Sequence, residues 1–473
     1  MPAARSFRDP GGFCIALNGR ILRVVEPDYV AQVEGFLNSP CARKFTAAGN
    51  LIPTRLLSKI EVSQWLKDPE FSAALDGCAI GAVFEHERVE FPSFPSEWPP
   101  EMLYAAAELT LNLACEALTC GYRLKDATPQ NILFRGTTPV FVDLLSFEPR
   151  KHGESVWTPY AQFVRTFLLP LLANKYWNTS LAEVFTTRRD GLEPAELVAR
   201  CTLFQKFRPP FLTLITLPTL LARKGEAAYG PRMDGNDEKA LFVIEALFKR
   251  LQSILKRLKP KTRRAEGWSN YMDTHSYERE AFAAKESFVR AVMAQFKPKH
   301  VLDIGANTGH FGRIAATEAA QVLAVDSDPA CAGESFARAR SESLNMLPLV
   351  VDMARPTPAL GWRNDECASF LDRARGQFDA VLMLAVLHHL LVTERVPLRD
   401  ILDLAAELTR ALLVIEFVPL EDPMFQRLLR GRGALFAHYN RAFFEESCQR
   451  QFEIVRGTDL PGTERRLYLL RKK

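Results

Sequence analysis

Two groups of residues in this chain have the types and spacing that chemistry requires. The first surrounds Val301–Phe311, where an apolar run ends in Asp303 and a turn containing Gly305, Asn307 and Gly309 follows. Glycines permit a positive φ in a tight turn and let a ligand approach the backbone. A turn between a strand and a helix N-terminus is the usual nucleotide site of open α/β sheets. The sequence therefore predicts a nucleotide-like ligand here.

Further acids and a histidine pair follow at the ends of later apolar runs. Asp326 ends one run, Asp352 ends another with Met353 directly after it, and a later run leads into His388 and His389. A carboxylate after the second strand can accept hydrogen bonds from a ribose diol, as in dinucleotide-binding folds. A neutral imidazole suits a general base near physiological pH, so the two histidines are the candidate catalytic residues. The alternative is that the pair only shapes the ligand pocket.

The second group lies in the N-terminal half. Asp126 and Asn131 have the D-x-x-x-x-N spacing of a catalytic loop, and Asp143 ends the apolar run that follows the next turn. This order resembles the catalytic segment of the protein-kinase-like fold, and the resemblance implies that these residues hold magnesium beside a phosphate. The alternative is that all three are turn and cap residues of a hairpin.

The elements that must position the first group alternate between strand and helix, which is typical of a parallel sheet with crossover helices. Predicted strands lie at 301–302, 321–325, 347–351, 378–384 and 411–417, and predicted helices at 277–296, 311–320, 329–343, 397–410 and 441–449. The segments 452–456 and 465–470 predict an antiparallel closing pair. We therefore expect an α/β fold for a domain at 262–473.

The elements around the second group are mixed, so we expect an α+β domain at 1–261. Asn18-Gly19 between two apolar runs predicts a hairpin, and a second extended pair is expected at 82–84 and 88–91. A helix is predicted at 101–118, and residues 155–250 read as helical. Within them, a buried helix from Tyr160 should stop or kink at Pro170, and 240–258 is amphipathic.

The region from 268 to 473 resembles the class I S-adenosylmethionine-dependent methyltransferases, because the turn and the later strand-end acids match that family in order. The resemblance implies a Rossmann-like sheet and S-adenosyl-L-methionine as the cofactor. It implies that Asp303 approaches the methionine end, that Gly305, Asn307 and Gly309 form the cradling turn, and that Asp326 binds the ribose. It further implies that Asp352 and Met353 contact the adenine and that Tyr271 lies over the cofactor carboxylate.

Other residues of this half have less defined roles. Glu416, in the strand at 411–417, is either at the active-site edge or a paired structural acid, and Lys285 lies where the family places a lid helix. His438 and Tyr439 precede a short helix and are candidates to face the methyl acceptor. No set of residues with metal-ligand spacing is visible, so no metal is predicted.

The segment at 124–143 resembles the catalytic segment of the protein-kinase-like fold, especially its small-molecule kinase branch. In that family the residues matching Asp126 and Asn131 lie in the catalytic loop, and the one matching Asp143 binds magnesium. The sequence departs from the family: Leu124-Lys125 precedes the first acid, Leu144-Leu145 follows the last, and no Gly-rich phosphate loop is found. Lys44 and Lys59 are the available lysines. A kinase-like fold without phosphotransfer and an active kinase both remain open.

Composition narrows the class of protein. The 473 residues carry a net charge of +4 and 47% apolar residues, as in an ordinary globular protein. The most apolar stretch, Phe211–Ala222, is too short to span a bilayer, so no membrane partner is predicted. The basic run at 256–264 reads as a helix end and linker rather than a nucleic-acid patch. Scattered cysteines and the absence of a signal-like N-terminus predict a cytoplasmic protein.

The whole chain also resembles bacterial two-part methyltransferases that include nodulation-protein relatives, on the segments Pro92–Leu103 and Leu124–Phe134. We therefore expect methyl transfer to a small-molecule or glycan-type acceptor, with the N-terminal domain serving substrate recognition, regulation or a protein partner. Two alternatives stay open. The protein is bifunctional with an N-terminal phosphotransferase, or it methylates a protein or RNA that a non-catalytic N-terminal module recruits.

Overall fold

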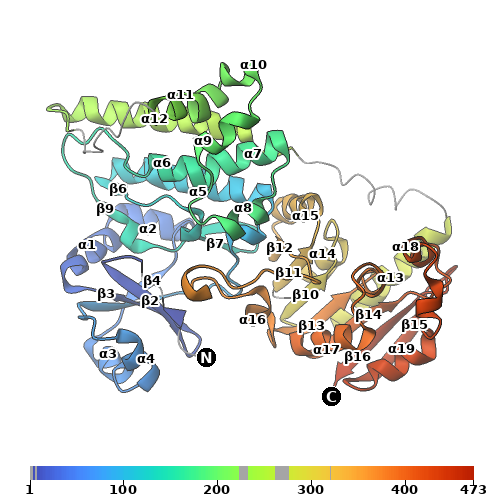
Figure 1. Ribbon diagram of the computed structural model, residues 1–473. Coiled ribbons are helices and arrows are strands. Elements are labelled where there is room, and N and C mark those ends of the chain that lie inside the picture. Colours follow the sequence, from blue (N-terminus) through green and yellow to red (C-terminus); the bar gives the residue numbers. More distant parts are fainter. Residues whose placement is uncertain (1–3, 6–7, 223–232, 262–275, 320) are drawn as a thin grey trace.

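Figure 1 shows the computed structural model of the chain, which describes residues 4–5, 8–222, 233–261, 276–319 and 321–473. Two bodies lie side by side, the N-terminal half in blue through green and the C-terminal half in yellow to red. The predicted boundary at 262 falls outside the described residues and stays a prediction. Among the helices of the described ranges, none has the length and apolar composition that a membrane crossing requires.

The C-terminal half is built on a seven-stranded sheet with the strand order β12-β11-β10-β13-β14-β16-β15. Its strands are β10 (His300–Ile304), β11 (Gln321–Asp326), β12 (Met346–Val350), β13 (Phe378–Met383), β14 (Thr409–Phe417), β15 (Phe452–Asp459) and β16 (Arg466–Lys472). The first five pair in parallel, and β16 runs antiparallel to β14 and β15. The predicted alternation and the antiparallel closing pair are confirmed.

Helices cover both faces of this sheet. They are α13 (Ser276–Phe296), α14 (His310–Ala316), α15 (Pro329–Ser341), α16 (Phe370–Ala374), α17 (Leu398–Leu408), α18 (Pro423–Leu429) and α19 (Arg441–Cys448). Val301 packs into the apolar cluster that contains Val289 of α13, and its neighbour Leu302 packs into the cluster that contains Ile401 of α17. This burial on both faces explains the near-continuous apolar strands. It leaves the carboxyl ends of β10–β14 as the edge where open α/β sheets bind ligands.

The N-terminal half has a five-stranded sheet with the order β1-β2-β3-β5-β4. Its strands, and those of two small sheets, are β1 (Ala4–Arg5), β2 (Gly12–Leu17), β3 (Arg20–Val25), β4 (Thr54–Leu56), β5 (Ala82–His86), β6 (Tyr122–Leu124), β7 (Ile132–Arg135), β8 (Thr138–Phe141) and β9 (Phe147–Pro149). The Asn18-Gly19 hairpin is confirmed, with Leu17 opposite Arg20. The extended pair predicted at 82–84 and 88–91 is wrong. β5 pairs with β3 and β4, while Phe91 leaves the sheet and packs on Phe370 and Phe378.

Helices make up the rest of this half. They are α1 (Pro27–Leu37), α2 (Pro40–Ala47), α3 (Lys59–Trp65), α4 (Pro69–Leu75), α5 (Pro100–Thr119), α6 (Tyr160–Phe163), α7 (Leu169–Trp177), α8 (Leu181–Thr187), α9 (Pro194–Leu197), α10 (Leu203–Lys206), α11 (Leu217–Ala222) and α12 (Asp237–Leu258). The helix from Tyr160 does not stop at Pro170. A π-helical turn at Val164–Leu168 joins α6 to α7, and the proline takes the second position of α7, where its missing N–H costs no hydrogen bond.

A buried interface joins the two halves. Arg373 of α16 forms an ion pair with the fully buried Glu97. The Nη1 atom of Arg373 also donates a hydrogen bond to the carbonyl oxygen of Pro92 at 2.6 Å. Helix α15 also lies tightly against α5, since a Cβ on Gly333 would come 2.2 Å from Glu101 Oε2. Removing one partner of such a buried pair strongly destabilises a protein, because the other charge stays buried and unpaired. The contacts of Arg373 and Gly333 therefore pack the two halves as one structure.

Candidate functional site

The turn after β10 has the backbone geometry that its glycines predict. Gly305 and Gly309 have φ values of +70° and +79°, and Asn307 is also left-handed at +49°. A Cβ on Gly305 would lie 2.9 Å from Val386, and one on Gly309 would lie 2.3 Å from the Ser335 hydroxyl oxygen. Both the conformation and the space therefore require glycine at these two positions.

Asp303 lies beneath this turn, near the end of β10. Its side chain is only 2% exposed, and its Oδ2 finds no hydrogen-bond partner among the described residues. Burial raises the pKa of this carboxyl to about 7. An unpaired buried carboxylate is costly, so this position suits a ligand that brings a cationic donor.

Asp326 connects the glycine turn to the end of β11. Its Oδ2 accepts a hydrogen bond from the backbone N–H of Asn307 at 2.8 Å, and its Oδ1 accepts one from Asp328 at 2.9 Å. Burial raises the pKa of Asp326, while these backbone donors oppose that shift. A carboxylate oxygen can accept more than one hydrogen bond, so both oxygens keep acceptor capacity for a diol.

Asp352 and Met353 follow β12. Asp352 accepts a hydrogen bond from the backbone N–H of Ala354 at 2.9 Å and pairs with Arg355 at 2.7 Å. Met353 is half-buried and lines a small apolar cavity of about 40 Å³ with Ile304, at the end of β10. The structure thus places this pair beside the central strand, with the acid already engaged by Arg355.

The histidine pair lies where β13 leads into a π-helical turn (His389–Thr393). His388 is 2% exposed, and its Nδ1 is unpaired within the described part of the chain. Burial lowers the pKa of His388 to about 3, with smaller contributions from His389, Arg465 and Lys285. The pKa of His389, whose ring lies 4.4 Å from that of His388, is also lowered by burial. Both imidazoles are therefore neutral at physiological pH.

A buried cluster of four charged residues adjoins His388. Glu416, near the end of β14, is fully buried and lies 2.7 Å from Lys285 Nζ and 3.3 Å from Arg465 NH1. Arg465 also pairs with Asp422 at 2.7 Å. Glu416 Oε2 has no partner within the described ranges. Glu416 thus fits both predicted roles, because it is a paired acid that keeps one oxygen available at the edge of the sheet.

The two aromatic candidates before α19 separate in the structure. His438 is exposed and lies edge-on to Phe443. Tyr439 is 3% exposed, and its ring packs against Phe425 and Phe417, with centroids 5.5 and 5.4 Å away. Its hydroxyl lacks a partner in the part of the chain that is described, and burial raises its pKa. Of the two, only Tyr439 points into the molecule.

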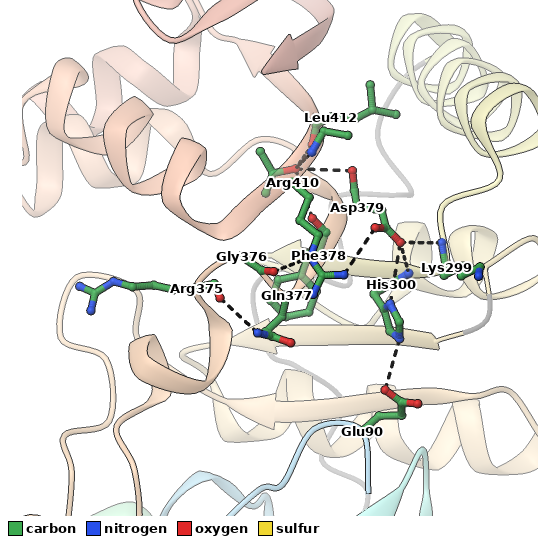
Figure 2. A network of polar contacts seen from close by, with 12 residues as sticks. Glu90, Lys299, His300, Arg375, Gly376, Gln377, Phe378, Asp379, Arg410 and Leu412 are labelled. Atoms are coloured by element: carbon green, nitrogen blue, oxygen red, sulfur yellow. Dashed lines mark hydrogen bonds and ion pairs between the residues drawn. The ribbon is translucent and has the colours of Figure 1, made fainter. Parts of the chain in front are cut away.

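Asp379 has a different place from the other strand acids because it opens β13 instead of ending it. Figure 2 shows its Oδ2 accepting hydrogen bonds from the backbone N–H groups of Lys299 (2.9 Å) and His300 (3.0 Å). Arg410 NH1 lies 4.0 Å from Oδ1, and the His300 ring reaches Glu90 of the N-terminal half at 3.4 Å. Asp379 therefore fastens the beginnings of three strands, at the edge opposite the glycine turn.

The N-terminal acids also converge. Asn131 Nδ2 donates to the Ser146 hydroxyl at 3.3 Å, and this hydroxyl donates to Asp143. Arg23 of β3 pairs with Asp143 at 2.9 Å. Burial raises the pKa of Asp126, and the negative charge of Asp143 adds to that shift. Lys44 and Lys59 lie elsewhere, on α2 and α3, so the cation beside the terminal acid is an arginine.

The predicted site and the described site differ at three residues. Tyr271 lies outside the described residues. Arg465 was missed altogether, and Lys285 was placed only by family resemblance. Both approach Glu416 from segments far away in the chain, α13 and the residue just before β16, so no local pattern marks them.

These residues fit S-adenosylmethionine. The turn leaves no room for side chains at Gly305 and Gly309, and the buried acid below it has an oxygen without a partner among the described residues. An ammonium group would satisfy that oxygen, and a diol would find acceptors at Asp326.

Comparison with known proteins agrees with this fold. Residues 275–452 match the family model described as a methyltransferase domain. Nodulation protein NoeA of Rhizobium meliloti (strain 1021) is 30% identical over 470 residues, which cover 98% of this chain and 95% of that protein.

Two solved structures illustrate the structural matches. The N-methyltransferase NodS from Bradyrhizobium japonicum WM9 has 15% identity and a TM-score of 0.31, over 42% of this chain and 99% of that one. Magnesium protoporphyrin IX methyltransferase (ChlM) from Synechocystis PCC 6803 has 18% identity and a TM-score of 0.32, over 44% and 95%. The family model leaves residues 1–274 uncovered, so the kinase-like resemblance stays a prediction. Because the similarity to NoeA spans nearly all of both chains, this chain belongs to the NoeA family, and it is an S-adenosylmethionine-dependent methyltransferase.

Proposed function

We propose that the enzyme methylates a hydroxyl or amine of a small-molecule or glycan-type acceptor at the carboxyl edge of β10–β14. The observation that carries this proposal is a group of buried polar atoms without partners among the described residues. They are Asp303 Oδ2, His388 Nδ1, Glu416 Oε2 and the Tyr439 hydroxyl. Each unpaired buried group costs about 1–3 kcal/mol, so their gathering at one edge favours a polar ligand there.

The cofactor half of the site consists of the glycine turn and the first acids. Asp303 binds the amino-acid end, the turn of Gly305, Asn307 and Gly309 cradles the methionine and ribose portions, and Asp326 receives the ribose hydroxyls. Asp352 and Met353 contact the adenine. When bound, S-adenosylmethionine supplies an activated methyl group to a lone pair of the acceptor, and its sulfur keeps the electrons of the broken bond.

The acceptor half begins at His388. A hydroxyl or protonated amine must lose a proton as its lone pair bonds to carbon, and the neutral His388 accepts it at Nδ1, which requires that the bound ligands raise the pKa of His388 from about 3. His389 keeps the neighbouring ring in place. The cluster of Lys285, Glu416 and Arg465 supplies donors and acceptors that orient the acceptor and keep water out.

The choice of a hydroxyl-rich acceptor rests on the charge of this cluster. Lys285 and Arg465 balance Glu416 and Asp422, so the cluster offers hydrogen bonds without a net charge. A neutral, hydroxyl-rich molecule such as a glycan fits such a surface better than a strongly charged one. The N-terminal half would then recognise the acceptor or regulate its access.

The proposal can be tested with extracts of small molecules and glycans from the producing cells. The purified enzyme is incubated with these extracts and with S-adenosylmethionine that carries a ¹³C-labelled methyl group, and products are found by mass spectrometry. We expect one labelled methyl on a hydroxyl or amine of a small molecule or glycan, and no label with His388→Ala. Label found only on protein or RNA would overturn the acceptor class.

Phosphotransfer by the N-terminal half is a second candidate, favoured by the convergence of Asp126, Asn131 and Asp143. ATP with magnesium should then raise the melting temperature of the full chain, and Asp143→Asn should abolish that rise. An unchanged melting temperature would remove this candidate.

A further inference from the structure

A large cavity, separate from the methyltransferase site, opens where the two halves meet. Its volume is about 840 Å³, within the range of sites for small molecules. The β2–β3 hairpin, the segment after β5 and the start of β7 form most of its wall. Residues 360–367 of the C-terminal half complete it, so a molecule inside would touch both halves.

Most of the wall is apolar. Leu17, Ile52, Phe94, Leu133 and Phe185 all line the cavity. Contact with such side chains favours the apolar body of a ligand, because apolar surface is removed from water.

Two polar groups of the wall have no hydrogen-bond partner among the described residues. Ser96 is 2% exposed, and its hydroxyl has no hydrogen-bond partner in the described structure. Gln130 Oε1 is likewise buried and unpaired among the described atoms, although its amide nitrogen donates to the carbonyl oxygen of Arg189 at 3.4 Å. The hydroxyl can donate to an anion, and the amide oxygen can accept from a ligand.

Among the charged side chains of the cavity wall, Arg88 is a cation that can bind an anion. The wall holds five arginines against three acids, and those residues are Arg8, Arg20, Arg23, Arg88, Arg189, Glu87, Asp365 and Glu366. Four of these arginines are already paired, Arg20 with Glu85, Arg23 with Asp143, and both Arg8 and Arg189 with Glu366. Arg88 reaches toward the β2–β3 turn, with its NH1 3.5 Å from where a Cβ on Gly19 would lie, and it has no ion pair within the described ranges. Its charge is available to a ligand.

We propose that this cavity binds an amphipathic anion, a small molecule whose apolar body lies on the apolar wall and whose phosphate, sulfate or carboxylate group faces Arg88. Ser96 and Gln130 add hydrogen bonds to the bound molecule. Because residues 360–367 of the C-terminal half close the cavity, the bound molecule contacts both halves and holds them together.

The test uses a pair of fluorescent probes that differ only in charge. They are 1-anilinonaphthalene-8-sulfonate, which is an anion, and the neutral N-phenyl-1-naphthylamine. Both are titrated into the full chain with saturating S-adenosylhomocysteine, which fills the cofactor site. Ala16→Trp fills the cavity from an exposed position of β2, and Arg88→Gln removes the charge. Ala47→Trp and Arg43→Gln, on the exposed surface of α2, are the matched controls.

We expect saturable binding of one sulfonate per chain, with both probes lost in Ala16→Trp. Arg88→Gln should weaken the sulfonate about tenfold and leave the neutral probe unchanged, because one charge-assisted contact is worth about that factor. The two control variants should bind like the wild type. Sulfonate binding that survives Ala16→Trp, or an Arg88→Gln effect equal on both probes, overturns the proposal. Displacement by decyl phosphate or by decanoate then identifies the preferred anion, and displacement by neither also overturns it.

Discussion

The two groups of acids in this protein differ in whether their polar atoms have hydrogen-bond or ion-pair partners among the described residues. In the N-terminal group, Asn131 donates to Ser146, Ser146 donates to Asp143, and Arg23 pairs with Asp143. In the C-terminal group, Asp303 Oδ2 and His388 Nδ1 remain without partners among the described residues. Asp303 and His388 are buried, whereas Asn131 and Asp143 are half-buried beside the buried Arg23 and Ser146.

The difference teaches how a functional site can be told from a structural one when both contain the same residue types. A buried network that satisfies itself stabilises the fold and needs no ligand. A buried group left unpaired costs stability, and a ligand that pairs it recovers that cost. We therefore assign ligand binding to the carboxyl edge of β10–β14 and a mainly structural role to the network around Asp143.

The largest effect is expected at His388. The change His388→Ala should lower turnover about 100- to 1,000-fold, because it removes the group that accepts the proton. Affinity for S-adenosylhomocysteine should change little. Turnover is measured as labelled product, with His438→Ala, an exposed histidine of the same half, as the control that keeps full activity. Full turnover in His388→Ala and loss in His438→Ala would reverse the assignment.

In the N-terminal group we expect a large loss of stability without loss of S-adenosylhomocysteine binding. Arg23→Met leaves the half-buried Asp143 without its cation, which should lower the free energy of unfolding by about 3 kcal/mol. Urea denaturation measures this change. Arg55→Met breaks an exposed pair with Glu85 and should have a much smaller effect. If Arg23→Met is as stable as Arg55→Met, the network around Asp143 does not hold the fold.

A moderate effect is expected at the proposed ribose site. Asp326→Ala should weaken S-adenosylhomocysteine about 30-fold in calorimetry, since it removes charged hydrogen-bond acceptors. Asp328→Asn is the control, because Asn can still cap α15 as Asp328 does through the backbone N–H of Ala330. Equal affinities in the wild type and Asp326→Ala would rule out the ribose assignment.

The smallest effect is a pH dependence from Asp303. Burial raises its pKa from 3.8 to about 7, so the folded chain holds this proton more tightly than the unfolded chain. The stability that this provides is complete below pH 3.8 and is lost as the pH rises toward 7. A cationic ligand group needs the ionised carboxyl, so affinity for S-adenosylhomocysteine should rise about tenfold from pH 6 to 8. Asp303→Asn should flatten this profile.

Much of the C-terminal fold could be predicted because its signals are local. Val301–Asp303, Gln321–Asp326 and Phe378–Met383 are apolar runs with turn residues at their ends, and each is a strand in the structure. Patterns failed where distant contacts decide the outcome. Phe91 leaves the N-terminal sheet for Phe370 and Phe378.

The site could be predicted only in its cofactor half. The glycine turn and Asp326 lie next to predictable strand ends, so their convergence follows from the topology of a parallel sheet. The pairing of Lys285 and Arg465 with Glu416 depends on how α13 and β16 pack, which no spacing reveals. The cavity between the halves, likewise, exists only after residues 360–367 meet the β2–β3 hairpin.

The most direct test of this account is calorimetry with S-adenosylhomocysteine on three proteins, the wild type, Asp303→Asn and Asp126→Asn. Each variant neutralises one acid, the buried Asp303 of the C-terminal group or the half-buried Asp126 of the N-terminal group. We predict that Asp303→Asn weakens binding about 100-fold, because a charge-assisted contact is lost, and that Asp126→Asn binds like the wild type. Wild-type affinity in Asp303→Asn, or an equal loss in both variants, would contradict the division between the two groups.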